Sequence, residues 1–292
     1  MKRFPLVSVI IPTYNQEQYI DNTLIALLNQ TYSNIEFIIS DDCSLDGTWQ
    51  RLLEWEVFLS AKGKVILHQQ PCNMGIAENY NWLFKHANGE IIVINEGDDI
   101  SLEERVERLV QYFNETGPWV MALQSEAEFL TDHGIYPSSL KQSLKYGYKY
   151  VESDYRWKKT PIVFDGNSMA FRRELIKKFP LIHPQTPWVD DALGKRALLL
   201  GGYVFYPDKL VLYRIHESNT SFEGMGKGKK RLRFLIQNLR DINYAFRNNY
   251  IKFHDFTKSM IYILLCMLVT ILNTIYLYRL VRNKLFGKKA VK

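Results

Sequence analysis

The fold of this chain is decided by one stretch, Ile91-Ile92-Val93-Ile94-Asn95-Glu96-Gly97-Asp98-Asp99-Ile100-Ser101. Its four consecutive β-branched residues predict a strand that is buried on both faces. Three carboxylates follow, where such a strand leaves its sheet. Ligands bind at that edge of an open α/β sheet, and clustered carboxylates repel one another unless a cation lies between them. The stretch therefore predicts a site with oxygen ligands for Mg²⁺ or Mn²⁺.

The same stretch also fits a solvated acidic turn before a helix. Ser101 and Glu104 have the spacing of a capping box, and apolar residues continue at helical spacing from Leu102 to Phe113. These residues leave both interpretations open, so the rest of the chain has to decide between them.

Length and composition indicate a globular protein. With 292 residues, 47% of them hydrophobic, the chain can bury one large core or two smaller ones, which excludes disordered and fibrous classes. The three cysteines are far apart and lack CxxC spacing, which argues against a disulfide framework or a zinc site. We expect a reducing compartment and no signal peptide before Val7, because no apolar region precedes that residue.

Charge is distributed unevenly along the chain. The net charge is +6, but residues 227–292 carry +13 and residues 1–226 therefore carry −7. This asymmetry predicts two regions with different partners: a catalytic or binding domain over 1–226 and a basic helical tail over 227–292.

Buried strands alternate with amphipathic helices through the first hundred residues. The expected strands cover 7–11, 35–39, 65–67 and 91–94, and the expected helices cover 16–30, a segment after Thr48, and 76–86. Such alternation predicts right-handed βαβ crossovers and a parallel sheet. Its carboxyl ends would gather Tyr14, Asp42, Asn73 and Asp98 at one edge. The chain lacks GxGxxG and GxxxxGK[ST], so neither a classical dinucleotide fold nor a P-loop explains this site.

Four motifs together resemble a known family. Ser8-Val-Ile-Ile-Pro-Thr-Tyr-Asn15, Asp41-Asp42-x-Ser44-x-Asp46-Gly47-Thr48, Asn73-x-Gly75 and Glu96-Gly-Asp98-Asp99-Ile100 resemble, in order and spacing, the inverting family 2 glycosyltransferases. The resemblance covers about residues 6–222. It implies the GT-A fold, a Rossmann-like, mostly parallel sheet flanked by helices, and a nucleotide-diphosphate-sugar donor.

The resemblance also implies how the base of the donor is bound. Asp42 would accept the imide N–H of the base, while Pro12 and Tyr14 would line the base pocket and Asn73 would contribute to the donor site. A carboxylate only accepts hydrogen bonds, so it selects the N3–H of uracil or thymine. Asp41 and Asp46 also fit the simpler role of an Asx turn and helix cap.

The metal motif departs slightly from the family, in which Asp-x-Asp-Asp is commoner. Glu96 is one methylene longer than Asp, so we expect it to meet the ion through water or to bind the ribose, and Asp98 to be the direct ligand. The resemblance further implies that His216 approaches the metal or the diphosphate, and that Arg214 pairs with phosphate oxygens.

A second acidic pair, Asp190-Asp191, resembles the family's Glu-Asp pair before a helix. By position, Asp191 matches the general base, and Asp190 fits a helix cap or an acceptor contact. Gly166 would leave room for the acceptor. Without the upstream motifs, two caps at a helix N-terminus would explain both carboxylates. Residues 124–157 show no periodicity and predict an irregular covering loop or acceptor surface.

Several functional classes compete with a single-addition transferase. A polyprenyl-phosphate sugar synthase and a processive polymerase share the first four motifs, but the chain lacks the Gln-x-x-Arg-Trp motif and the multiple spans of a processive enzyme. A non-catalytic nucleotide-sugar-binding protein would not need Asp191. A nucleic-acid-binding protein is disfavoured, because the basic tail carries no nucleic-acid motif.

The tail contains about 20 residues without a charge, 259–278, enough to cross a bilayer as a helix up to about residue 280. A buried helix of the globular domain is the alternative, since Asn273 and Thr274 interrupt the apolar surface. Both flanks are basic, so a helix that lies in the membrane–water interface is a second alternative. We expect an enzyme of the inner membrane with its catalytic domain facing the cytoplasm, which extends a lipid-linked glycan for a surface polysaccharide or lipopolysaccharide.

Overall fold

The computed structural model describes residues 4–137, 150–151, 164, 166–217, 219 and 228–286, with the side chains of 150–151 and 273–286 left out. The chain divides into two compact units, residues 1–218 and 219–292. The sequence-based boundary between 226 and 227 lies outside the described residues and stays a prediction.

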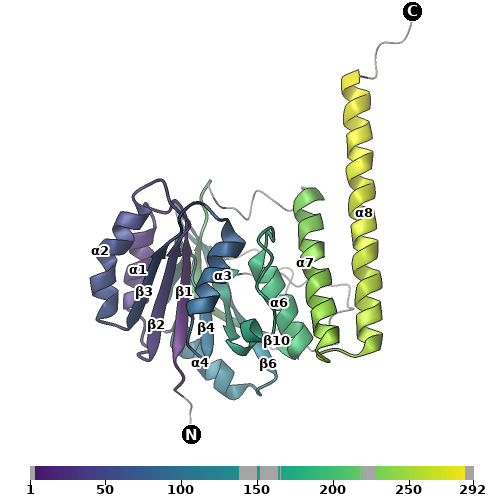
Figure 1. The fold of residues 1–292 in the computed structure, drawn as a ribbon. Coiled ribbons are helices and arrows are strands. Elements are labelled where there is room, and N and C mark those ends of the chain that lie inside the picture. The colour runs from purple at the N-terminus through teal and green to yellow at the C-terminus, as the bar shows by residue number, and fades with distance from the viewer. Residues whose placement is uncertain are drawn as a thin grey trace, which may run out of the picture. The chain divides into compact units, whose positions relative to one another are not determined.

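The first unit is built on a single mixed sheet (Figure 1). Along its main path the strand order is β3-β2-β1-β4-β9-β6-β10-β5, with β7 paired to β6 and β8 paired to β10. The strands are β1 (Val7–Thr13), β2 (Ile35–Asp41), β3 (Lys64–Gln69), β4 (Ile91–Ile94), β5 (Ile100–Ser101), β6 (Val120–Thr131), β7 (Gly134–Pro137), β8 (Tyr150–Val151), β9 (Met169–Arg172) and β10 (Gly202–Arg214). The helices of this unit are α1 (Ile20–Leu28), α2 (Thr48–Ser60), α3 (Ile76–His86), α4 (Arg105–Glu115), α5 (Glu174–Lys177) and α6 (Val189–Leu200), with a 3₁₀ turn, η3 (Gly166–Ser168).

The directions of the strands determine which strand ends lie at the same edge of the sheet. The strands β1, β2, β3 and β4 are parallel, as predicted from the alternation of strands and helices. The strand β9 is antiparallel to both β4 and β6, and β10 is parallel to β6. The carboxyl ends of β4, β6 and β10 therefore point to the same edge as those of β1 to β3, although distant parts of the chain supply them.

The core has two layers, one on each face of the sheet. Neighbouring residues of β1 illustrate the alternation, because Val9 and Ile11 pack in one cluster with Leu24 and Leu109 while Ile10 packs in the other. Helices α1, α2 and α4 thus cover one face and α3 and α6 the other. This arrangement of a mixed α/β sheet between helices confirms the predicted fold class.

Two local predictions are wrong. Residues 124–131 belong to β6 and residues 134–137 to β7, whereas no regular element was expected over 124–157. The reason is that Gln124, Ser125 and Glu126 are buried polar residues, which hide the strand pattern. Residues 138–149 and 152–157 of that segment lie outside the described residues. Helix α1 begins at Ile20 rather than at Gln16.

Asn15 does not cap α1. It has a positive φ of 52°, and its Oδ1 accepts the N–H of Leu45 at 2.8 Å, while Tyr19 occupies the N-cap position. The side chain therefore joins the loop after β1 to the loop after β2 instead of beginning a helix.

The second unit contains helices α7 (Gly228–Arg247) and α8 (Phe253–Phe286), which pack against each other. The rings of Phe246 and Phe256 stack at 4.3 Å across the turn between them. Residues 253–272 of α8 are long and apolar enough to cross a membrane. A core helix of a soluble protein can meet the same criterion, so the exposed surface of α8 has to decide between them.

Candidate active site

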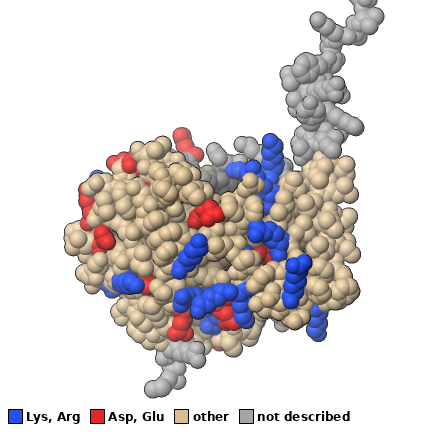
Figure 2. Space-filling model, viewed as in Figure 1, with Lys and Arg blue, Asp and Glu red and all other residues tan. Residues whose placement is uncertain are grey.

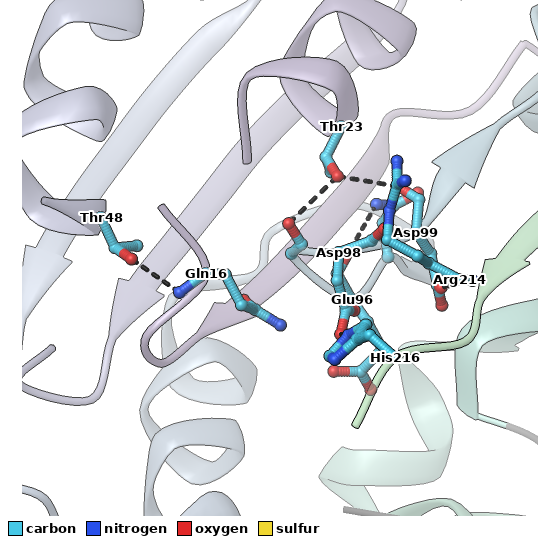
Figure 3. Close-up of polar contacts among 10 residues, drawn as sticks. Gln16, Thr23, Thr48, Glu96, Asp98, Asp99, Arg214 and His216 are labelled. Atoms are coloured by element: carbon cyan, nitrogen blue, oxygen red, sulfur yellow. Dashed lines mark hydrogen bonds and ion pairs between the residues drawn. The ribbon is translucent and has the colours of Figure 1, made fainter. Parts of the chain in front are cut away.

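The acidic turn after β4 is a buried, braced structure and not a solvated one. Asp98 is 8% exposed and Asp99 is fully buried. Thr23 Oγ1 of α1 lies 3.1 Å from the carbonyl oxygen of Gly97 and 2.9 Å from that of Asp99 (Figure 3). A Cβ atom on Gly97 would lie 2.2 Å from Gln16 Oε1 and 2.8 Å from Thr13 Cγ2, so a larger residue here would require both side chains to shift.

The pairing of β5 with β10 shows the path of this turn. Residues 100–101 pair with 211–212 of β10, so the turn runs from β4 across the ends of the intervening strands to β10. The capping box of the alternative interpretation does not form at Ser101, because the Ser101 hydroxyl donates to Asn95 Oδ1 and α4 has no side-chain cap. The turn therefore carries its carboxylates to the carboxyl end of β10.

Asp98, Arg214 and His216 come together there (Figure 3). His216 Nε2 lies 3.0 Å from Asp98 Oδ2. Arg214 Nε donates to the carbonyl oxygen of Asp98, and its backbone N–H donates to Asp99 Oδ1, both at 2.9 Å. The His216 ring stacks on Tyr19 at 4.6 Å, and the Arg214 guanidinium lies 5.0 Å from the centre of the same ring. Tyr19 thus supports both side chains.

The residues at this point fit a divalent cation that is shared with a substrate. A carboxylate oxygen and an imidazole nitrogen converge in the Asp98–His216 pair. Over the described parts of the chain, no set of three His, Cys, Asp or Glu side chains forms a cage for a metal ion. Mg²⁺ and Mn²⁺ commonly use one or two protein ligands and complete their shell with phosphate oxygens and water, so two ligands suffice.

Glu96 belongs to a neighbouring cluster. Its Oε1 accepts a hydrogen bond from the hydroxyl of Tyr80 on α3, at 2.5 Å. A Cβ atom on Gly166 would lie 3.5 Å from Glu96 Oε1 and 3.3 Å from the Asp190 Cβ, which places Glu96, Gly166 and Asp190 side by side. Burial, and then the charge of Glu96, hold the pKa of Tyr80 well above its usual value, so its hydroxyl remains a donor. Sequence reasoning missed Tyr80, because a tyrosine on an amphipathic helix reads as a core residue.

Asp42 holds the turn that precedes α3. Its two carboxylate oxygens accept the backbone N–H groups of Met74 and Gly75, at 2.7 and 2.9 Å. Burial raises the pKa of Asp42, and these two N–H groups oppose the rise. Asn73 lies at the same turn, where its Oδ1 accepts the N–H of Gly75. Each carboxylate oxygen has two lone pairs, so Asp42 retains capacity to accept a ligand N–H.

The remaining residues of the predicted base pocket lie at the end of β1. Pro12 pairs in register with Ser40 of β2, and Tyr14 is 41% exposed. Asp41 is fully buried and makes an Asx-type contact, since its Oδ2 accepts the N–H of Ser44. Asp46 likewise accepts the N–H of Thr48, which gives both aspartates the structural role left open by the sequence.

Asp190 and Asp191 begin α6. Asp190 Oδ1 accepts the N–H of Asp191 at 2.8 Å, and its Cβ faces Gly166. It does not cap the helix as one sequence interpretation held, because Trp188 occupies the N-cap position and no side chain caps α6. Asp191 Oδ2 lies 3.9 Å from Lys195 Nζ. Burial raises the pKa of Asp191, and Lys195 only partly opposes the rise. A carboxylate with a raised pKa is a stronger base than one in water.

Comparisons with known proteins identify the family that this chain matches. The model of Glycosyl transferase family 2 matches residues 8–179, more than half of the chain. An uncharacterized glycosyltransferase of Haemophilus influenzae is 29% identical over 76% of this chain and 69% of its own length. The Escherichia coli protein WfgD, a UDP-Glc:alpha-D-GlcNAc-diphosphoundecaprenol beta-1,3-glucosyltransferase, is 34% identical over 35% of this chain and 38% of its own.

Solved structures match over more of the chain but at lower identity. Staphylococcus aureus TarS 1–349 in complex with UDP-GlcNAc has a TM-score of 0.63 at 20% identity, over 82% of this chain and 66% of that one. The mannosyltransferase PcManGT of Pyrobaculum calidifontis, in complex with GDP-Man and Mn²⁺, has a TM-score of 0.61 at 22% identity, over 83% and 64%. These matches show the GT-A type of fold. With the family model over most of the first unit, they show that the chain belongs to glycosyl transferase family 2.

Proposed function

We propose that this glycosyltransferase moves a sugar, with inversion, from a UDP- or dTDP-linked donor to a lipid-linked glycan in bacterial surface polysaccharide or lipopolysaccharide synthesis. The observation that carries the proposal is the convergence of Asp98, Arg214 and His216 at the carboxyl ends of β4 and β10. The UDP-GlcNAc bound to TarS and the diphosphoundecaprenol-linked substrate of WfgD support the donor and the acceptor class.

Each predicted site residue has a role in this proposal. Asp42 accepts the imide N–H of the base, which Pro12 and Tyr14 flank, beside Asn73. Glu96 binds the ribose, and Arg214 pairs with phosphate oxygens. Gly166 and Asp190 border the acceptor.

Asp98 and His216 would hold Mn²⁺ or Mg²⁺, and a bound ion would neutralise the charge that grows on the leaving diphosphate. Asp191 takes the proton of the acceptor hydroxyl as that oxygen attacks the anomeric carbon from the face opposite the diphosphate. The sugar–phosphate bond breaks as the new glycosidic bond forms, which inverts the configuration.

The surface of α8 supports a membrane location. Its exposed side chains include Ile261, Leu264, Leu265, Leu268 and Leu272, each more than half exposed. Its buried residues include the polar Ser259 and Thr270. A water-soluble helix has the opposite arrangement, so the apolar surface fits contact with lipid at the inner membrane.

Figure 2 shows Lys and Arg side chains over α7, and residues 259–272 of α8 carry no charged side chain. Basic groups at the membrane surface each contribute about 1 kcal/mol of attraction to anionic lipid. They would keep the catalytic domain on the cytoplasmic side, near a lipid-linked acceptor.

The first test is transfer by the purified full chain in detergent, with UDP- and dTDP-sugars, Mn²⁺ and undecaprenyl-diphosphate-linked glycans. We expect transfer by the parent and its loss in excess chelator. Asp191→Asn should lower kcat at least about 100-fold, because an amide cannot accept the proton, and should leave the Kd for the donor within about twofold.

Asp190→Asn is the matched control and should retain more activity than Asp191→Asn. Undiminished transfer in chelator would refute the metal requirement. Turnover by Asp191→Asn within tenfold of the parent would assign the base to another residue. Donor binding by the parent without any transfer would instead indicate a non-catalytic nucleotide-sugar-binding protein.

A further inference from the structure

Helix α3 carries three consecutive polar residues that are all buried, Asn79, Tyr80 and Asn81. Asn79 Nδ2 donates to the carbonyl oxygen of Ser40, at the end of β2, at 2.9 Å. Asn81 forms two hydrogen bonds with the backbone of Ile182, of 2.8 and 2.9 Å, and so fixes the segment that leads to α6. Each residue therefore joins α3 to a different wall of the candidate site.

Tyr80 makes the connection to the acidic turn. It is 2% exposed, and its hydroxyl donates to Glu96 Oε1. The carboxylate that receives this bond lies beside Gly166 and Asp190. Tyr80 thus holds the Glu96 carboxylate from inside the protein, at a point that Gly166 and Asp190 border.

We propose that Tyr80 is a positioning residue for Glu96: its buried hydroxyl holds the longer glutamate side chain in the direction in which it meets a nucleoside diphosphate. This inference rests on the proposed function. An aspartate at position 96 is shorter by one methylene, about 1.5 Å. Its oxygen would lie beyond hydrogen-bond distance from the Tyr80 hydroxyl unless the backbone moved. The tyrosine and the glutamate therefore act as a matched pair.

A double-mutant cycle on the full chain in detergent tests this pairing, with the Kd of UDP and of dTDP measured by calorimetry in Mn²⁺. Tyr80→Phe removes only the hydroxyl, and we expect the Kd to rise about tenfold, as for the loss of a hydrogen bond to a charged group. Glu96→Asp should raise the Kd by a similar factor. In the Glu96→Asp background, Tyr80→Phe should change the Kd less than twofold.

Tyr32→Phe is the matched control, because Tyr32 is 4% exposed and its hydroxyl donates to the carbonyl oxygen of Pro5, within the same unit but away from the acidic turn. It should leave both Kd values unchanged. A purely structural role of Tyr80 would lower the melting temperature and weaken binding by the same factor in both Glu96 backgrounds.

That equal effect, or an unchanged Kd in Tyr80→Phe alone, would overturn the positioning role while leaving the proposed function intact. Failure of the parent to bind either nucleotide would overturn the proposed function, and this inference with it.

Discussion

At the scale of the residue, the buried environment of Asp191 raises the pKa of its carboxyl group, which predicts a measurable effect of pH. Because burial raises its pKa, the folded protein holds this proton more tightly than the unfolded chain does. Stability attributable to Asp191 is therefore greatest below its ordinary pKa of about 3.9 and falls as the pH rises toward the raised value. The same shift requires a higher pH before the carboxylate can act as a base.

We predict that the acidic limb of kcat/KM lies above pH ~4, where an unperturbed aspartate would titrate. Lys195→Met removes the nearby positive charge and should move this limb to still higher pH. The measurement is the pH profile of kcat/KM for the parent and this variant. A limb at or below the ordinary pKa, or one unmoved by Lys195→Met, would contradict the assignment.

At the scale of the element, a single buried arginine ties the acidic turn to its surroundings. Arg105, on the first turn of α4, is fully buried and donates to the side chain of Asn95, at 3.1 Å. It also donates to the carbonyl oxygens of Ile94 and Asn167, at 2.8 and 2.6 Å. These bonds join α4, the end of β4 and η3, and they bring a positive charge close to the buried Asp99.

We predict that Arg105→Met lowers the free energy of unfolding by at least about 3 kcal/mol, because it leaves buried carbonyl acceptors without their donor and removes the positive charge close to Asp99. Urea unfolding followed by tryptophan fluorescence measures the change. Arg173→Met, which removes a bond to the carbonyl oxygen of Asn88 at an exposed position, should change it by less than about 1 kcal/mol. Equal effects in the two variants would show that Arg105 has no bracing role.

At the scale of the whole molecule, the two units have surfaces of different character. The first unit buries its apolar residues in two layers around the sheet, whereas α8 of the second unit exposes them. The chain is therefore organised as a family 2 catalytic unit followed by a basic, apolar-faced helical unit.

We predict that Leu264→Lys with Leu268→Lys shifts the full chain from the membrane to the soluble fraction, because each lysine at a bilayer-buried helix position costs about 3 kcal/mol. Both side chains are about half exposed and lie one turn apart. His254→Lys adds a charge at the exposed start of α8 and should leave the chain in the membrane fraction. Fractionation without detergent measures how each chain divides between the membrane and soluble fractions. A parent chain found in the soluble fraction would remove the main support for a lipid-linked acceptor.

Local sequence patterns predict the strands and helices of the first hundred residues and their order, but not β6 and β7. Runs such as 91–94 are apolar throughout, and a strand that is buried on both faces needs no distant information to be recognised. The pairing of Asp98 with His216 was also within reach, but only through resemblance to a family, because 118 residues separate the two side chains.

Tertiary structure alone decided what depends on long-range contacts. The strand β9 enters the sheet antiparallel between β4 and β6, and no local pattern encodes that insertion. The roles of Tyr80 and Arg105 were hidden for the same reason. Local sequence shows that a side chain lies on a helix, but only the packing of distant strand ends shows which carboxylate or carbonyl group it meets.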